Sequence, residues 1–285
     1  MAIVHYRPLA LGELLMPTID QQYPNDDGPA SLFLTHVDRT GFSFVQRQPP
    51  VKSSRRVLPS ELMVNVSWLA ANQGEHQLPN GGLMVVGADY WNKAAQDKNY
   101  NGYKKVDIDQ ILDQVEDQTG QDYEFSAPVI LHQLQTDNKY NTDHRCWFTS
   151  IVKEINHHGE LDELAISLDP SEVKTSTQKY CKLNNNANQG EQIGYLIVSS
   201  GHGQMDLNGD SYRYDFNADG ATPTPVNGLL ANFAKQCNAI TSFRQQDFTQ
   251  APFLVAKKTT RNGPQGGWLR RCKLSDRSVS VVIDE

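Results

Sequence analysis

The chain has 285 residues, with 33 acidic and 26 Lys or Arg side chains and a net charge of −7. This negative balance argues against a nucleic-acid groove, which needs a basic face. No apolar run approaches the roughly 18 residues that a membrane-spanning helix needs. Arg7 and Pro8 interrupt the apolar N-terminus, so residues 1–15 do not read as a signal peptide.

Three short sequence patterns, called phrases here, recur along the chain in the same order: an opening run, a hairpin phrase and a closing phrase. The opening run, with Pro ahead of apolar residues, occurs at residues 14–19, 125–131 and 248–255. The hairpin phrase covers residues 32–45 and 274–281. The two segments alternate alike and align without a gap, so that Val37 corresponds to Leu274, Phe42 to Val279 and Phe44 to Val281. The closing phrase, residues 66–74, matches residues 193–201 in its aromatic, Leu and terminal Gly spacing. Such self-similarity predicts a repeat protein.

The repeats predict an all-β fold. Apolar and polar residues alternate over 62–68 and 191–197, and β-branched and aromatic side chains are concentrated there. Clusters of Gly, Pro, Asn and Asp separate these runs. Short strands separated by such turn residues are typical of tandem antiparallel β-sandwich repeats. The predicted domains are repeat 1 at 1–104, repeat 2 at 105–227 and an incomplete repeat 3 at 228–285.

Two segments do not fit simple alternation. Residues 106–118 place apolar side chains at 108, 111, 112 and 115, which is a helical spacing, and residues 229–240 favour a helix by propensity. Both precede an opening run, at equivalent positions in the repeat. We predict that they form the first strands of the repeats that follow, with a short linking helix as the alternative.

The phrase at residues 66–70, preceded by the hairpin of residues 34–44, resembles the H-type lectin domain, an antiparallel six-stranded sandwich. The opening runs, residues 267–271 and the ending at 281–285 resemble lectin-like repeats of large bacterial surface proteins, including accessory proteins of the mannose-sensitive haemagglutinin pilus. The resemblance implies a non-enzymatic extracellular or cell-surface module for adhesion, which binds glycans or neighbouring copies of itself as a homo-oligomer or in a larger assembly. A purely structural filament or tail-fibre subunit without a ligand is the alternative.

In H-type lectins an acidic residue on an early loop works with basic and aromatic groups nearby. By this resemblance Asp26 and Asp27 supply the acid, Trp68 a stacking face and His76 a donor, since a sugar presents one apolar face and a ring of hydroxyls. Tyr195 stands at the position equivalent to Trp68, which favours a core role for Trp68 as the alternative. His76 also fits a solvated turn.

Two short motifs carry the D-x-N-x-D pattern that suits calcium, the one candidate cofactor. Oxygen ligands at alternate positions bind Ca²⁺. The candidate ligands are Asp206, Asn208 and Asp210 in the first motif and Asp215, Asn217 and Asp219 in the second. The twelfth position from Asp215 is Val226 rather than Glu, so neither motif is a full EF-hand. Hairpin turns rich in Asn, Asp and Gly explain both motifs without a metal.

A peptidase is the enzyme alternative. The strand at 194–198 and the turn at 199–203 resemble the strand-to-His-Gly turn of caspase-like cysteine peptidases, with His202 as base and Cys237 as nucleophile. Such a fold needs βα alternation, which the chain lacks. The repeat also aligns residues 200–202 with residues 73–75, an ordinary strand end. We therefore predict a protein that is not an enzyme.

The cysteines and the last repeat leave two questions open. Cys146, Cys181, Cys237 and Cys272 lie in repeats 2 and 3 and allow three disulfide connectivities, and reduced thiols are equally compatible. The third repeat lacks its closing phrase, which leaves strand edges without partners. Either the chain is a fragment, or residues 2–6 of a neighbouring copy supply the strand.

Overall fold

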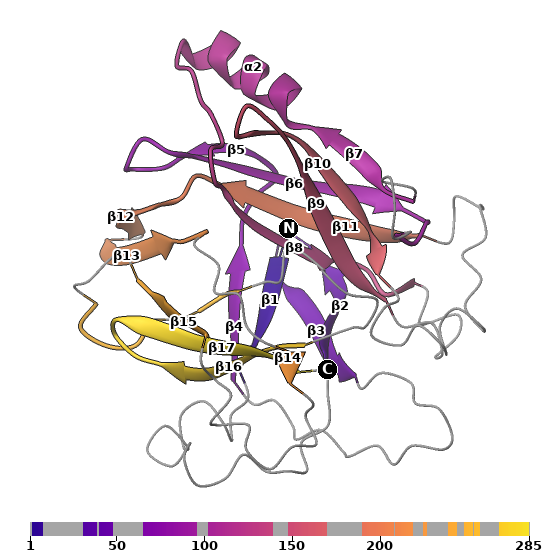
Figure 1. Ribbon diagram of the computed structural model, residues 1–285, viewed down its shortest axis with the longest axis vertical. Coiled ribbons are helices and arrows are strands. Elements are labelled where there is room, and N and C mark those ends of the chain that lie inside the picture. The colour runs from indigo at the N-terminus through magenta and orange to yellow at the C-terminus, as the bar shows by residue number, and fades with distance from the viewer. Residues whose placement is uncertain are drawn as a thin grey trace, which may run out of the picture.

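A computed structural model describes residues 2–7, 31–38, 40–47, 65–95, 102–138, 148–169, 190–207, 209–218, 225–226, 239–243, 248–252, 254–256 and 268–284. The described residues form mostly β-strands in antiparallel sheets with one helix, so the all-β prediction is confirmed (Figure 1). No described helix is long and apolar enough to cross a membrane.

A four-stranded antiparallel sheet lies at the centre of the described structure. Its order is β5 (Gly74–Gln77), β6 (Leu83–Trp91), β11 (Glu191–Val198) and β8 (Val129–Leu134). On β11, Ile193, Tyr195 and Ile197 enter one hydrophobic core, while Leu196 and Val198 enter another. Successive side chains of a strand point to opposite faces. The sheet is therefore buried on both faces, which explains why β11 has a nearly continuous apolar sequence.

A second antiparallel sheet supplies much of the larger core. It runs β7 (Lys104–Asp107), β10 (Glu160–Asp169) and β9 (Thr149–His157). Leu164, Ile166 and Leu168 of β10 are fully buried and belong to the same core as Ile197 of the central sheet. The buried His132 ring on β8 adds a polar link, since its Nδ1 lies 2.8 Å from the Ser150 hydroxyl on β9.

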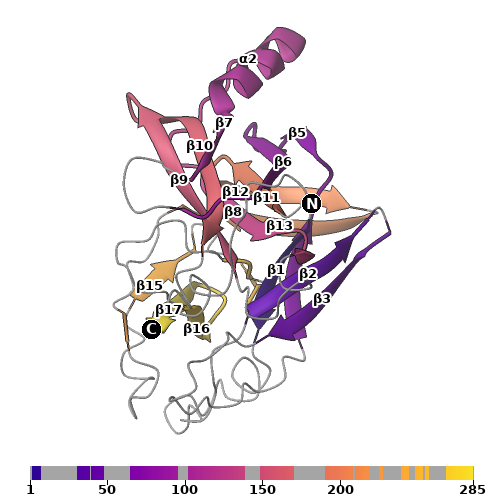
Figure 2. The ribbon, with the colours of Figure 1, turned by 90° about the vertical axis from the view of Figure 1, so that its right-hand side faces the viewer.

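Helix α2 (Ile108–Thr119) corrects the strand predicted over residues 106–118. Only the first residues of that segment are strand, and the rest is the helix of the alternative interpretation. Asp107 caps the helix by accepting a hydrogen bond from Gln110 N at 3.0 Å, and Gly120 ends it with φ of 66° and an N–H bond to Glu116 O. The apolar stripe packs on the larger core. The helix lies above β7 and β10 in Figures 1 and 2. Capping and a stripe at helical spacing together outweigh the short alternation at its start. Residues 229–238 of the second such segment lie outside the described residues.

Two two-stranded ribbons pack against the two cores of the central sheet. In the first, β1 (Ala2–Arg7) pairs along its whole length with β4 (Asn65–Ala70); in the second, β2 (Ser31–Val37) pairs with β3 (Phe42–Arg47). Figures 1 and 2 show β1, β2 and β3 side by side, and β1 contacts β2. The predicted donation of residues 2–6 to a neighbour is therefore not needed to place that strand, because β1 pairs within its own chain.

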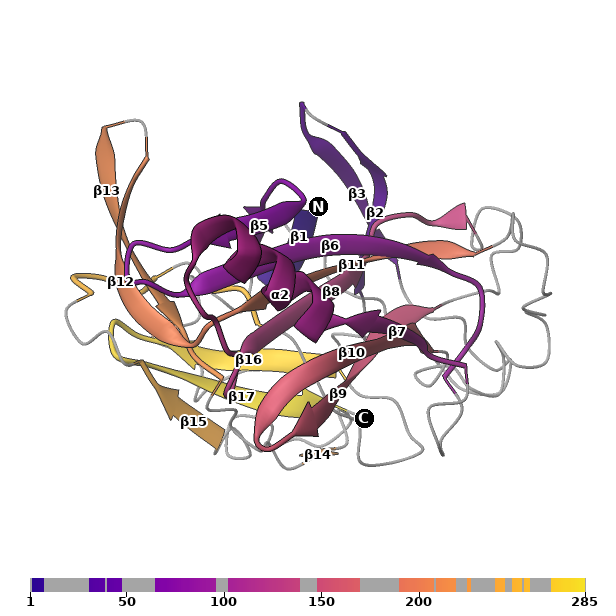
Figure 3. The same ribbon diagram turned by 90° about the horizontal axis from the view of Figure 1, so that it is seen from above.

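The rest of the described chain forms two further units. The hairpin of β12 (Gly201–Leu207) and β13 (Asp210–Phe216) projects beyond the central sheet on the same side as β2 and β3 (Figure 3). Near the C-terminus, β17 (Ser278–Asp284) pairs with β16 (Trp268–Leu274), β15 (Ala239–Ser242) and β14 (Pro225–Val226).

The hairpin phrase predicted twice from the sequence is built twice in the structure. Val37 pairs with Phe42 and Leu274 pairs with Val279, as the alignment of the two segments without a gap predicts. Each first strand skips one residue in the pairing at the same place, between Leu34 and His36 and between Arg271 and Lys273. The two hairpins share register and bulge. Repetition of whole domains remains a prediction.

The predicted boundary at residue 104 lies between strands of a single sheet. β6 from predicted repeat 1 pairs with β11 from predicted repeat 2 over eight residue pairs, from Glu191 with Trp91 to Val198 with Met84. The larger core likewise joins Phe33 and Leu83 to Ile130 and Ile193. Strands from both sides of that boundary therefore share one sheet and one core.

Candidate functional site: an exposed aromatic cluster

Three aromatic side chains from two strands form a partly exposed group, called here the aromatic cluster. Phe42 and Phe44 lie two residues apart on β3, so they share one face, and their ring centroids are 6.1 Å apart. Phe42 meets Trp68 of β4 edge to face at 5.6 Å. Trp68 is 59% exposed and Phe44 42% exposed, so the cluster presents ring surface to solvent.

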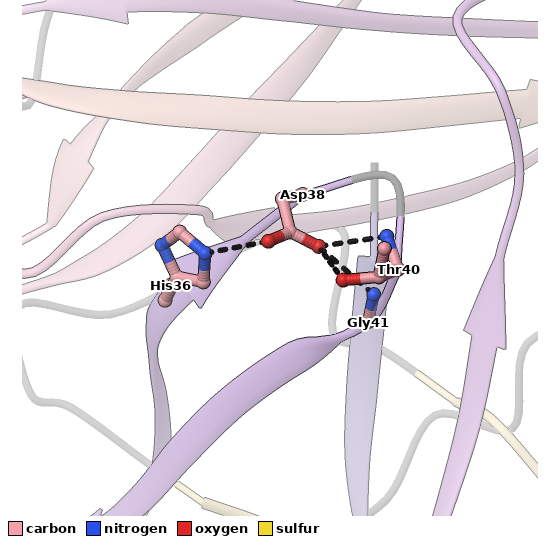
Figure 4. A network of polar contacts seen from close by, with 4 residues as sticks. All are labelled: His36, Asp38, Thr40 and Gly41. Carbon is pink, nitrogen blue, oxygen red and sulfur yellow. Dashed lines mark hydrogen bonds and ion pairs between the residues drawn. The ribbon is translucent and has the colours of Figure 1, made fainter.

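The turn before Phe42 is fixed by one carboxylate. Asp38 Oδ1 accepts hydrogen bonds from Thr40 N at 2.7 Å, from the Thr40 hydroxyl at 2.7 Å and from Gly41 N at 3.0 Å (Figure 4). Its Oδ2 lies 2.9 Å from His36 Nε2. A carboxylate that binds the backbone two and three residues ahead is a turn-forming device. The turn therefore delivers Phe42 into β3 in a fixed register.

The second copy of the hairpin shows what Asp38 contributes. Ser275 stands at the same place, and its hydroxyl accepts from Arg277 N at 3.1 Å and Ser278 N at 3.0 Å. Both turns also close with the same backbone bond, Asp38 N to Gly41 O and Ser275 N to Ser278 O, each at 2.9 Å. A hydroxyl performs the same turn function, so the hydrogen bonds of Asp38 are explained by the turn.

We expect Asp38→Ser to retain the hairpin and Asp38→Ala to weaken it. The Thr40 hydroxyl, His36 and the Thr40 amide hold the pKa of Asp38 well below its usual range. Because the folded pKa is the lower one, the folded state binds fewer protons, and this contribution is present above the unfolded pKa of about 3.9 and is lost as pH falls below it. Urea unfolding at pH 7 and pH 3 measures it. Asp38→Ala should unfold at lower urea than the parent at pH 7, with a smaller difference at pH 3. Equal loss at both pH values would contradict the assignment.

The remaining lectin-type residues do not converge on the aromatic cluster. His76 is half-buried on β5, and its Nε2 lies 2.9 Å from the carbonyl oxygen of Asn72 in the preceding turn. No hydrogen bond or ring contact joins His76 to Trp68 in the structure, which describes both. Asp26 and Asp27 lie outside the described residues. Of the predicted sugar-binding residues, the structure thus places Trp68 alone in an exposed aromatic surface.

The sequence did not indicate Phe42 and Phe44 as site residues. Their signal was present, since two aromatics at i and i+2 of a strand share a face. Alternation alone does not show whether that face lies in a core or at a surface. The structure adds what the sequence lacks, which is that β3 lies at a surface where that face meets Trp68.

The calcium motifs occupy the β12–β13 hairpin and the residues after it. Asp206 pairs with Ser211 and Leu207 with Asp210, so Asp206 and Asp210 lie on opposite faces of the hairpin. Asp215 lies opposite His202, and Asn217 donates its side-chain amide to Ser242 O at 3.1 Å. No group of three or more His, Cys, Asp or Glu side chains in the described part of the chain could hold a metal. The register gives no support to calcium at Asp206 and Asp210, and Asn208 and Asp219 lie outside the described residues.

The residues of the peptidase alternative are only partly described. His202 is exposed near the start of β12. Cys237, Cys146 and Cys181 lie outside the described residues, and Cys272 lies on β16 with its side chain not described. The described residues therefore do not test the predicted pairing of a Cys237 nucleophile with a His202 base.

A buried carboxylate elsewhere has a structural role. Glu191 is 2% exposed at the start of β11, and its Oε2 accepts from the Thr136 hydroxyl at 2.5 Å and Asn138 N at 3.0 Å. These bonds attach the segment after β8 to β11. Comparisons of the chain with protein-family models, with curated proteins and with solved structures found no match.

Proposed function

We propose that this chain is a non-enzymatic surface protein of H-type lectin-like sandwich repeats, and that it binds glycans through the aromatic cluster. The observation that supports this proposal is the exposure of Trp68 and Phe44 beside Phe42. Rings held at a surface by their strands offer an apolar face on which the apolar face of a sugar can stack.

The aromatic cluster suits a role outside the core. Burying a large aromatic side chain contributes strongly to folding, so leaving Trp68 mostly in solvent gives up that contribution. Exposed aromatics grouped on one surface are typical of binding sites. Adhesion at a cell surface and the extracellular location implied by the resemblance follow from the same proposal.

We expect Trp68→Ala to reduce retention on immobilised glycans by about 30-fold, since a central aromatic contact is typically worth about 2 kcal/mol. The measurement is a glycan array with the parent chain, followed by affinity on the best ligand. Tyr212→Ala is the matched control, because Tyr212 is also an exposed aromatic, at 49%, on a separate hairpin.

The control should bind like the parent. Loss of retention in both variants, or in neither, would contradict the proposed site, and a parent chain that no glycan retains would contradict the proposed function. The second candidate function, a fibre subunit without a ligand, predicts that outcome together with ordered polymers in electron microscopy.

A further inference from the structure

The second strand of two hairpins carries another strand on its outer edge. In the β9–β10 hairpin, β7 pairs antiparallel with residues 163–166 of β10 on the side away from β9. In the β16–β17 hairpin, β15 pairs antiparallel with residues 278–281 of β17. Since β16 occupies the other edge of β17, β15 takes the outer one. An added antiparallel strand at this position is therefore part of how this chain completes its hairpins.

The equivalent edge of β3 carries no strand among those that the structure describes. β3 pairs with β2 alone among the described strands. Gly41 O bonds back toward β2, and backbone groups alternate along a strand, so the N–H and C=O groups of Phe42 and Phe44 point to the outer edge. The matching residues of β17, Val279 and Val281, pair with Thr241 and Ala239 of β15. Two residues of β3 thus present the groups that their counterparts use to bind a strand.

We propose that β3 of a second copy of this chain occupies this edge, antiparallel and centred on Ser43. In that register Phe42 of each copy lies opposite Phe44 of the other, so the four phenylalanines form two hydrogen-bonded ladder pairs. The edge is self-complementary, which suits a two-fold homodimer. Phe42 and Phe44 of both copies then lie on one face, and cross-strand aromatic pairs stabilise such sheets.

The proposal goes beyond glycan binding and does not require it. It joins two aromatic clusters into one continuous surface across the dimer. It also covers a strand edge that would otherwise invite nonspecific pairing.

A cysteine at the centre of the register tests the pairing. Ser43 is exposed and lies opposite itself across the two-fold axis, as a non-hydrogen-bonded pair with about 4.5 Å between Cα atoms, a separation that a disulfide spans. We expect Ser43→Cys to form a covalent dimer on mild oxidation, seen on non-reducing gels and lost with reductant. The matched control is Gln46→Cys on the same strand, whose two copies would lie about 20 Å apart in this register. The parent chain under the same conditions accounts for the native cysteines.

A proline provides the second measurement. Phe44→Pro removes an amide that points away from β2, so the hairpin keeps its bonds while the dimer loses one on each side. We expect sedimentation velocity to show a concentration-dependent twofold mass change for the parent and for Phe44→Thr, and its loss for Phe44→Pro. Trp68→Ala should keep the dimer even if it loses glycan binding, which separates this proposal from the proposed function. A monomeric parent, cross-linking of Gln46→Cys equal to that of Ser43→Cys, or a Phe44→Pro dimer would each overturn the proposal.

Discussion

Replacing either of two adjacent residues of β11, Leu196→Ala or Ile197→Ala, should lower the free energy of unfolding by about 3 kcal/mol. Truncation of a fully buried Leu or Ile removes its transfer free energy and leaves a cavity, at a typical cost of 2–5 kcal/mol. Leu196 is 1% exposed and Ile197 is fully buried, and they belong to different cores on the two faces of the central sheet. Urea unfolding of each variant measures the loss.

The comparison between the two variants tests the architecture. A sheet with one solvated face would tolerate truncation of one of two adjacent residues, because their side chains point to opposite faces. Met205→Ala on the half-exposed β12 is the control and should stay within about 1 kcal/mol of the parent. A cost below 1 kcal/mol at Leu196 would contradict the layer that β4 and β13 contribute through Leu69 and Phe216.

Local pairing could be predicted from the sequence, while long-range pairing could not. The gapless alignment of residues 32–45 with 274–281 predicts a shared register because turn chemistry and alternation are local, and both hairpins have it. The partner of a strand is not encoded in its own alternation. β4 and β11 carry matching phrases, yet β4 pairs with β1 alone among the described strands, and β11 lies between β6 and β8.

This difference in partners explains the fate of the two matching aromatics. Tyr195 on β11 is 6% exposed, because a central strand is covered on both faces, whereas Trp68 at the equivalent position on β4 is mostly in solvent. The equivalence with Tyr195 favoured a core role for Trp68 on sequence grounds, and the exposure of Trp68 shows that this interpretation was wrong. The hydrogen-bond donor that the sequence did assign, His76, binds its own turn instead.

The helix was the other place where local signals competed. Residues 106–118 alternate briefly and then repeat at helical spacing, and β7 and α2 divide the segment between these two patterns. The N-cap Asp107 and the terminal Gly120 were the deciding local signals. An assignment that gave them full weight would have placed both elements correctly.

Gly87→Ala should destabilise the fold by about 3 kcal/mol, because a strand position opposite a large aromatic has no room for a methyl group. Gly87 pairs directly with Tyr195, and a Cβ at residue 87 would stand 2.2 Å from both Cζ and the hydroxyl oxygen of that ring. Burial raises the pKa of Tyr195 to about 12, with Asp89 adding to the rise, as expected for a phenol held inside the core. The ring cannot leave without exposing the larger core, and overpacking of this kind typically costs 1–3 kcal/mol.

A double-mutant cycle identifies the clash as the cause. Tyr195→Ala alone should cost about 4 kcal/mol as a cavity, and adding Gly87→Ala to it should cost little more, since the methyl group then enters that cavity. Gly41→Ala is the matched control, because nothing lies within 4 Å of a Cβ at that position, and it should change stability by less than about 0.5 kcal/mol. Additive losses from Gly87→Ala and Tyr195→Ala would place the cost of the methyl group elsewhere and would contradict the packing of Tyr195 over Gly87 that joins β6 to β11.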